Sequence, residues 1–268
     1  MTAQDFIHPA DAAAISSLEA IPVLPSITKK LMDLNSERIV HGLNLASKVK
    51  LSPTQLPSLY NLLPPICNQL GIPQPEFYLE LDPNPNAYAF GDTYTSISIN
   101  SGIVEMLKED ELKAILGHEC GHILCRHMLY HSLAFYLFEG PVENRDSNLS
   151  VLAEPILAAL RTWQRMSEFS CDRVAAFVAG PQATIRALAR LAGGPAAITN
   201  DLNLVELAEQ ADEYDRITNG NLWNRYLKTS TVLDMTHPFT TIRIREVLRW
   251  VASEQFKSLR ERYPMLIN

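Results

Sequence analysis

The sequence predicts an α+β fold that is mainly helical and carries one small sheet with antiparallel strands. Apolar residues recur mostly at the spacing of helices. Residues that favour strands gather between positions 76 and 99. An apolar run at 115–124 contains the pattern H-E-x-x-H, which places two histidines four residues apart on one face of a helix. We therefore expect the chain to be organised around the helix that carries His118 and His122.

Length and composition describe an ordinary globular protein. The chain has 268 residues, of which 47% are hydrophobic and 20% charged. The net charge of −7 and the lack of a long basic cluster argue against a nucleic-acid partner. The N-terminus does not resemble a secretory signal, and no apolar stretch reaches the roughly 18–20 residues of a membrane span, so we expect no transmembrane segment and a cytoplasmic location. The four cysteines lack C-x-x-C spacing and are expected to be reduced.

Residues 1–50 are predicted to form an N-terminal helical extension, with one helix at 27–34. This extension carries little site chemistry. It either packs on the rest of the chain or lies over the site and restricts access to it. His8 and His41 are weak candidates to contact a metal there, because lone histidines rarely are ligands.

The next part of the chain alternates between helix and strand signals. A helix is expected at 56–70, bent at Pro64-Pro65, and Gly71 ends it. A short helix at 103–107 precedes the histidine helix. Between these two helices the sequence predicts three strands, at 76–81, 86–91 and 94–99.

The histidine helix carries the chemistry. Asp110 is its expected N-cap. His118 and His122 can direct two imidazoles at one ion, and two imidazoles with an oxygen ligand suit zinc. Glu119 lies beside them and can take the proton of a water that zinc activates.

Two glycines on the same helix, Gly117 and Gly121, are small enough to let a strand or a substrate approach the metal face. This expectation depends on their size alone.

The second half of the sequence reads as helices. Two apolar arms, 128–138 and 151–160, flank a polar stretch, and each is about half a membrane span long. We expect a core hairpin there, with contact to a membrane surface or a partner through 128–160 as the alternative. Further helices are predicted at 166–178, 182–192, 202–217, 223–228 and 240–259.

A catalytic zinc needs a third protein ligand, and the helix at 166–178 offers one. Glu168 and Asp172 are four residues apart among apolar neighbours, where an ionised carboxylate is costly unless it is paired or metal-bound. We assign Glu168 as the third ligand and Asp172 as the acceptor of a hydrogen bond from a ligand imidazole. The alternative is a salt-bridged pair with Arg165 or Arg173. Weaker candidates for the third ligand are Glu143, Asp146 and Glu154.

Four motifs in this order resemble the HtpX-like zinc metallopeptidases, the gluzincin family that includes the CAAX prenyl proteases. The resemblance runs from about Leu51 to Trp250. The motifs are Asn86-Ala87-Tyr88-Ala89-Phe90-Gly91, His118-Glu119-Cys120-Gly121-His122, Glu168-Phe169-Ser170-Cys171-Asp172 and the H-P-x-x-x-x-R-I pattern from His237 to Ile244.

The resemblance implies a zincin-type catalytic domain over residues 51–268 and one Zn²⁺ per chain. It implies that His118, His122 and Glu168 bind the zinc and that Glu119 is the general base. A peptide would lie along the strand formed by Asn86, Ala87, Tyr88 and Ala89, which is consistent with strand addition at a sheet edge.

His237 and Arg243 would stand near the cleft, Arg243 as an outer partner of the ligands. His237 could donate to the oxyanion of the tetrahedral intermediate. For His237 the alternative is a helix cap, and for Arg243 a structural salt bridge.

The chain differs from the membrane members of that family, because its inner stretch at 128–160 is too short and interrupted to span. It therefore resembles a soluble branch, and prenylated or membrane-protein substrates do not carry over. We expect a zinc-dependent endopeptidase that acts on peptides or unfolded proteins. The alternatives are a zinc-bound inactive or latent member that acts as a binding module, and a peripheral module that uses residues 128–160.

Overall fold

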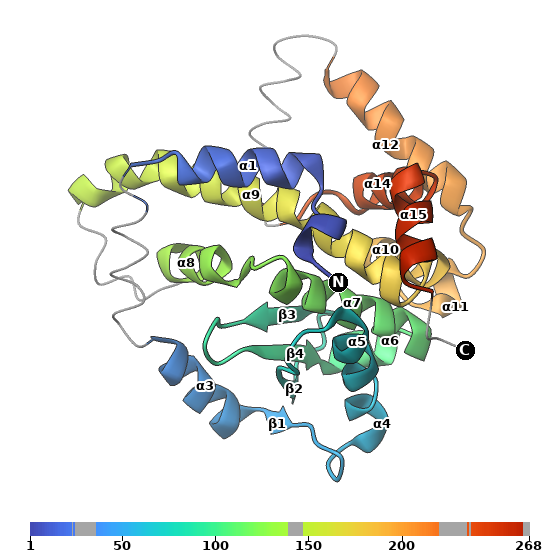
Figure 1. The fold of residues 1–268 in the computed structure, drawn as a ribbon, viewed down its shortest axis with the longest axis horizontal. Coiled ribbons are helices and arrows are strands. Elements are labelled where there is room, and N and C mark those ends of the chain that lie inside the picture. The colour runs from blue at the N-terminus through green and yellow to red at the C-terminus, as the bar shows by residue number, and fades with distance from the viewer. Residues whose placement is uncertain (23, 25–35, 139–146, 220–234, 236, 265–268) are drawn as a thin grey trace.

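A computed structural model describes residues 1–22, 24, 36–138, 147–219, 235 and 237–264 (Figure 1). The fold is mainly helical with one small mixed sheet, which confirms the predicted fold class. The helices predicted at 27–34 and 223–228 lie outside the described residues.

The sheet has four strands in the order β1-β2-β4-β3. Their bounds are Val49–Lys50 for β1, Glu76–Glu80 for β2, Ala87–Phe90 for β3 and Ser96–Asn100 for β4. The β2 and β4 strands are parallel, and the other pairs are antiparallel. The three predicted strands are present, and β1 is a short addition that the sequence did not signal. Since β3 is last in the order, one of its edges is not covered by another strand of the sheet.

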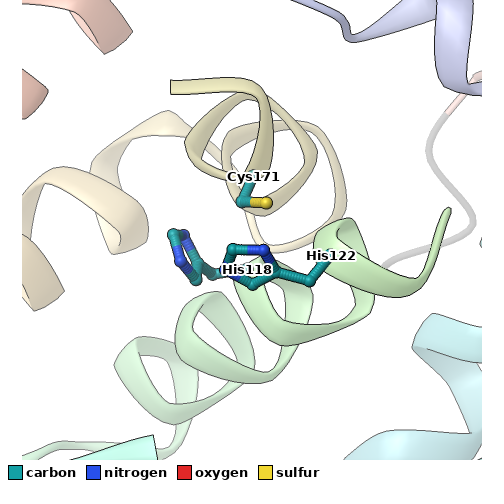
Figure 2. A group of neighbouring side chains, drawn as sticks. All are labelled: His118, His122 and Cys171. Atoms are coloured by element: carbon teal, nitrogen blue, oxygen red, sulfur yellow. The ribbon is translucent and has the colours of Figure 1, made fainter. Parts of the chain in front are cut away.

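Helix α7 (Glu109–Leu124) lies between the sheet and the long helix α9 (Ser147–Val178) (Figure 1). Gly117 and Gly121 are on the side of α7 that meets α9. A Cβ on Gly121 would lie 2.9 Å from the Cα of Cys171, and one on Gly117 would clash with Val178. Figure 2 shows Cys171 on the turn of α9 that faces α7. The expectation that these glycines admit a strand or a substrate is therefore wrong, because they admit a second helix.

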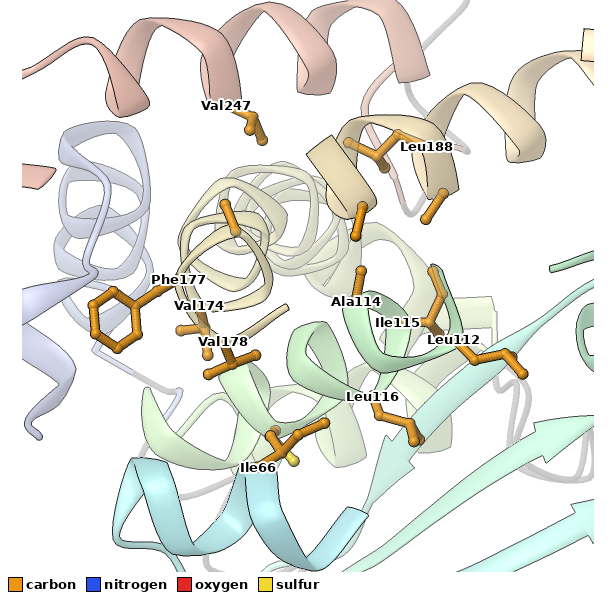
Figure 3. Packing of buried hydrophobic residues seen from close by; sticks show 14 of the residues in the cluster. Ile66, Leu112, Ala114, Ile115, Leu116, Val174, Phe177, Val178, Leu188 and Val247 are labelled. Carbon is orange, nitrogen blue, oxygen red and sulfur yellow. The ribbon is translucent and has the colours of Figure 1, made fainter. Parts of the chain in front are cut away.

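The main core surrounds α7 (Figure 3). Leu116 of α7 and Ile66 of α5 (Leu63–Leu70) fill its lower side, and Val174 of α9 faces them. Leu188 of α10 (Pro181–Gly193) and Val247 of α14 (Thr240–Val251) close the upper side. Helix α7 is thus fixed by packing on several sides, which holds its side chains in defined positions.

Four predicted helices have markedly different bounds in the structure. The arm at 151–160 and the helix at 166–178 are one helix, α9, because no proline or glycine lies between Leu160 and Met166. The predicted helix at 56–70 is split into α4 (Pro57–Tyr60) and α5, and Pro64 and Pro65 stand in the first turn of α5, where proline is tolerated. Ser253 caps α15 (Glu254–Arg262), so the predicted helix at 240–259 ends at Val251.

The remaining described elements pack around this frame. Their bounds are Ala3–Asp5 for η1, Pro9–Glu19 for α1, Ser36–Ser47 for α3, Ser101–Met106 for α6, Met128–Phe138 for α8, Ala196–Thr199 for α11 and Leu204–Thr218 for α12.

A second, smaller core joins α1, α8 and α9. It contains Leu18, Leu133, Leu160 and Trp163. Both apolar arms therefore bury side chains inside the protein. Within the described part of the chain, no helix has the length and apolar character needed to cross a membrane. Contact with a membrane surface or a partner through 128–160 stays a prediction.

The N-terminal segment is held by the last part of the described chain. Phe6 is fully buried and packs against Phe177 and Trp250 with ring centroids 5.5 and 6.2 Å away. Asp5 pairs with Arg262 at 3.0 Å. Helix α1 follows directly and lies along α9 (Figure 1).

Candidate metal centre

The histidine helix begins two residues earlier than predicted. Its N-cap position is Lys108, whose backbone amide donates to the carboxylate of Glu111 at 3.0 Å. Asp110, the expected cap, stands in the first turn instead. Three acidic residues in that turn suit the positive end of the helix dipole.

Two imidazoles of α7 and one carboxylate of α9 converge beneath the surface. The Nε2 atom of His118 lies 3.2 Å from Oε2 of Glu168, and Nε2 of His122 lies 3.4 Å from Oε1 of the same carboxylate. All three side chains are buried. The structure therefore brings together the three ligands predicted from sequence.

One oxygen of this carboxylate is unsatisfied. Oε2 of Glu168 is buried and accepts no hydrogen bond from the described residues. Arg243 approaches this oxygen to 3.4 Å, but a buried acceptor without a hydrogen bond is still costly. A cation held by the two imidazoles and the carboxylate would satisfy it, and this set of nitrogen and oxygen donors suits zinc. The residues present thus fit a metal ion.

A cysteine lies in the same place. The ligand atoms of His118, His122 and Cys171 are all within 4.8 Å of one another (Figure 2). Burial raises the pKa of the Cys171 thiol well above its usual value, and its Sγ lies 3.6 Å from Nδ1 of His127. The thiol form is a poor metal ligand. Glu168, whose two oxygens face both Nε2 atoms, is the better third donor.

The far side of His118 is held by charged groups. Its Nδ1 lies 3.0 Å from Oδ1 of Asp172. Arg243 donates to both oxygens of Asp172, from Nε at 2.8 Å and from Nη2 at 2.7 Å. Burial alone would raise the pKa of Asp172, but the Arg243 guanidinium outweighs it and lowers the pKa below its ordinary value. An ionised Asp172 favours the His118 tautomer with a proton on Nδ1.

The alternative salt bridges do not account for these carboxylates. Arg165 donates to the carbonyl of Met235 at 2.9 Å, and Arg173 donates to the carbonyl of Ile7 at 3.0 Å. Glu168 and Asp172 instead lie against Arg243.

The two histidines differ in their electrostatic surroundings, taking the protein groups alone. Burial lowers the pKa of His122 to about 4. Burial also acts to lower the pKa of His118, but the carboxylates of Glu168 and Asp172 prevail and raise it to about 10. The carboxylates are therefore concentrated on the His118 side of the centre.

Glu119 is poised as a base near neutral pH. Burial, aided by the negative charge of Glu168, raises the pKa of Glu119 to about 7. Its carboxylate accepts a hydrogen bond from the backbone amide of Ala89 in β3. The side chain that follows His118 thus connects the centre to the edge strand.

The free edge of β3 exposes the backbone of two alanines. The amide of Asn100 donates to the carbonyl of Asn86, so these two residues form a hydrogen-bonded pair. Hydrogen-bonded and non-hydrogen-bonded pairs alternate along antiparallel strands. Ala87 and Ala89 therefore direct their amides and carbonyls away from β4, and the bond from Ala89 to Glu119 agrees with this.

Two cavities follow this edge. One of about 420 Å³ reaches toward Phe135 of α8, and one of about 220 Å³ reaches toward Leu188 of α10. Asn86, Ala87, Glu119 and His237 line both cavities. A cleft therefore runs along β3 and past Glu119.

His237 stands at the entrance of the cleft. Its side chain is 54% exposed, and its Nε2 lies 3.5 Å from Oε2 of Glu168. The cap of α14 is Phe239, so His237 does not cap that helix.

The other sequence candidates lie elsewhere or outside the description. The ring of His8 caps α1, and Nδ1 of His41 lies 3.0 Å from Glu76. Glu143 and Asp146 fall among residues that are not described, as does the side chain of Glu154.

Sequence reasoning missed two histidines beside His122. The ring centroids of His131 and His127 lie 4.7 and 5.4 Å from that of His122. The available signal was the recurrence of histidine soon after the motif.

Comparisons with known proteins show what this chain is similar to. Residues 54–251 match the model of peptidase family M48. The plastoglobule-localized metallopeptidase 48, chloroplastic, of Arabidopsis thaliana is 33% identical over 266 residues, covering 98% of this chain and 76% of that protein. A protease HtpX homolog of Trichormus variabilis is 29% identical over 63% of this chain and 68% of that protein. The crystal structure of S. mikatae Ste24p aligns with a TM-score of 0.44 and 17% identity, over 87% of this chain and 64% of that one.

Proposed function

The chain belongs to peptidase family M48 and is a metallopeptidase, and we propose that it hydrolyses internal peptide bonds with one zinc ion held by His118, His122 and Glu168. The observation that supports this proposal is the position of the Glu168 carboxylate. It faces both Nε2 atoms within 3.4 Å and keeps one buried oxygen without a hydrogen bond.

Each side chain around the centre has a task. Zinc bound there supplies Lewis acidity, which acidifies water and polarises a peptide carbonyl. Glu119, with a pKa near neutral, takes the proton of the attacking water and returns it to the leaving amine. Asp172, fixed by Arg243, holds the proton of His118 on Nδ1 and so leaves the Nε2 lone pair free for the metal.

The substrate is a peptide or an unfolded protein that binds along Asn86, Ala87, Tyr88 and Ala89. The outward backbone groups of Ala87 and Ala89 can pair with an extended chain as an added strand. Such pairing recognises only the peptide backbone. The preference for particular substrate side chains therefore depends on the two cavities. We propose that His237, which is exposed at the cleft, donates to the oxyanion.

The rival function is a zinc-bound latent member that only binds its partners. Glu119 favours turnover, because a purely structural zinc site has no use for a buried carboxylate beside its ligands.

The cytoplasmic location also stays a prediction. The name of the Arabidopsis thaliana relative places that protein on plastoglobules.

A comparison of wild type with Glu119→Gln tests the proposal. Metal analysis should find about one zinc per chain in both proteins. Cleavage of casein by Glu119→Gln should fall by at least about 10²-fold, because a general base contributes that much or more. Equal cleavage by the two proteins, or a wild type without metal under zinc-replete conditions, would contradict the proposal.

A further inference from the structure

His122 has a buried hydrogen-bond partner that the motifs do not include. Its Nδ1 lies 3.3 Å from Nδ1 of His127. The other ring nitrogen of His127, Nε2, lies 3.1 Å from Oδ2 of Asp11. Asp11 is 1% exposed and His127 is 4% exposed. A chain of two contacts thus leads from a metal-site histidine to helix α1.

The end of α7 turns His127 back toward His122. Arg126 has a φ of 60°, the left-handed conformation that often ends a helix. The amide of Arg126 donates to the carbonyl of Ile123 at 3.1 Å, and the amide of His127 donates to the carbonyl of His122 at 2.9 Å. This pair of bonds is a Schellman motif. The backbone thereby places the His127 ring beside the ring of His122, five residues earlier.

The proton positions along this series of hydrogen bonds are determined by the groups at its two ends, the metal at His122 and the carboxylate of Asp11. If Nε2 of His122 binds a metal, its proton is on Nδ1, and that N–H needs an acceptor. Nδ1 of His127 can accept only when its own proton is on Nε2. Nε2 faces the carboxylate of Asp11, which accepts that proton's hydrogen bond. One arrangement of protons therefore satisfies every nitrogen of both rings.

Asp11 is itself fixed from α9. Ser170 donates from Oγ to Oδ2 of Asp11 at 2.6 Å, and the amide of His8 donates to the same Oγ at 2.9 Å. Ser170 is two residues from Glu168 on α9. The thiol of Cys171 can also donate to Nδ1 of His127, over 3.6 Å, but a thiol is the weaker donor. The carboxylate of α1 is thus aligned by the helix that carries the third ligand.

We infer that His127 and Asp11 are positioning residues of the metal centre: they hold the His122 imidazole in the tautomer and orientation that bind the metal. This inference rests on the proposed function, because it assumes a metal at His118, His122 and Glu168. It makes helix α1 part of the centre.

The inference changes the expectation for residues 1–50. A segment that shields the site would raise peptidase activity when removed. A segment that supplies Asp11 weakens metal binding when removed. The described residues agree with the second case, because α1 packs along α9 and Asp11 approaches His122 through His127.

Two substitutions of His127 test the relay, the series of hydrogen bonds from His122 through His127 to Asp11. Glutamine carries an acceptor and a donor at one end and can make both hydrogen bonds, whereas leucine can make neither. Zinc affinity, measured by competition with a chelator, should fall about 10–100-fold in His127→Leu, and His127→Gln should recover most of it. The visible absorption of the Co²⁺-loaded proteins should change in His127→Leu and resemble wild type in His127→Gln.

A matched pair of substitutions in helix α1 separates an effect on the position of the His122 ring from an effect on protein stability. Asp11→Ala should weaken zinc binding about as much as His127→Leu. Leu18→Ala disturbs the packing of the same helix, where Leu18 is fully buried, but leaves the relay in place. It should lower the melting temperature without a comparable loss of zinc affinity.

The outcomes distinguish the inference from the proposed function. A wild-type protein that binds neither zinc nor Co²⁺ overturns both. A wild type that binds zinc, with His127→Leu and Asp11→Ala no weaker than Leu18→Ala, overturns the relay alone. Equal losses in His127→Leu and His127→Gln also overturn it, because hydrogen bonding would then not be the cause.

Discussion

The two histidines of the metal centre are supported in different ways. Behind His118 stand an ionised carboxylate and a buried guanidinium, Asp172 and Arg243, which bind each other through two hydrogen bonds. Behind His122 stands a second imidazole, and only beyond it a carboxylate, Asp11. The first pair lies within the residues that match the family model, and Asp11 lies outside them. One side of the centre is therefore built entirely within the matched residues, and the other is completed by the N-terminal helix.

The difference is also electrostatic. The carboxylates raise the pKa of His118 to about 10, and burial lowers that of His122 to about 4. Charge concentrated on one side gives that side stronger hydrogen bonds. The other side holds its ligand through neutral donors and acceptors, where the tautomer decides the orientation.

Removing the proposed ligand that both sides share should give the largest effect. Glu168→Ala deletes the carboxylate that faces both Nε2 atoms, and we expect purified protein to contain no zinc. Asp172→Asn keeps all three donors and should weaken zinc binding only about 10–100-fold. Metal analysis and chelator competition compare the two variants. If Asp172→Asn lost more zinc than Glu168→Ala, the roles of these residues would be reversed.

Combining one change on each side tests whether the sides act independently. Asp172→Asn and His127→Leu act through different ligands, so their fold losses of zinc affinity should multiply in the double variant. Independent sites agree with this rule within about 0.5 kcal/mol, a factor of roughly two. A double variant no weaker than the poorer single one would show that both changes disturb the same feature.

The close contact between helices α7 and α9 offers a structural test of both sides of the centre together. In Gly121→Ala the new Cβ would lie 2.9 Å from a backbone atom of Cys171, so the helices must separate. Overpacking costs about 1–3 kcal/mol, and the gain in helix propensity offsets at most about 1 kcal/mol of it. We expect a net loss of stability and weaker zinc binding, measured by denaturation and competition.

Gly42→Ala in α3 is the control for that experiment. A Cβ at Gly42 meets nothing within 4 Å. This change should stabilise the protein by about 0.5–1 kcal/mol. A Gly121→Ala protein as stable as Gly42→Ala would show that the two helices can separate freely.

The smallest effect concerns the acidity of Asp11. Burial acts to raise the pKa of Asp11. Hydrogen bonds from His127 and Ser170, together with the charge of His127 in the metal-free protein, prevail and lower it. A carboxylate with a lowered folded pKa stabilises the protein above the unfolded value, near 4, and loses this stabilisation as pH falls through the folded pKa. The stability advantage of wild type over Asp11→Asn, measured on metal-free samples, should therefore be full at pH 6 and shrink below pH 4. A gap that stayed constant down to pH 3 would contradict the role of charge at Asp11.

Spacing along one helix explains what the sequence could predict. His118, Glu119 and His122 follow from the helical repeat, as do Glu168 and Asp172 on the next functional helix. Arg243 was placed near the site by a motif, and the structure adds that it binds Asp172 directly. The small sheet followed from its concentration of strand formers.

Contacts between distant segments explain what it could not. Asp11 and His127 are 116 residues apart, and no pattern in either segment indicates that they meet. The turn at Arg126 uses the left-handed conformation without a glycine, so its helix-ending signal was absent. The glycines of α7 were assigned the wrong neighbour because size shows that something comes close, but not which segment.

The contacts that hold the N-terminal segment have a consequence for when the centre can form during synthesis. Residues 5–11 leave the ribosome before the segments that they contact: Phe6 packs on Trp250, Asp5 pairs with Arg262, and the centre that we infer Asp11 to support also needs Arg243. At ordinary translation rates the first of these residues waits roughly 10–50 s for the last. During the later part of that interval the growing chain carries the histidine motif without the groups that complete it. Because the proposed centre needs Arg243, it cannot be complete until synthesis has passed that residue, well after the histidine motif has been made.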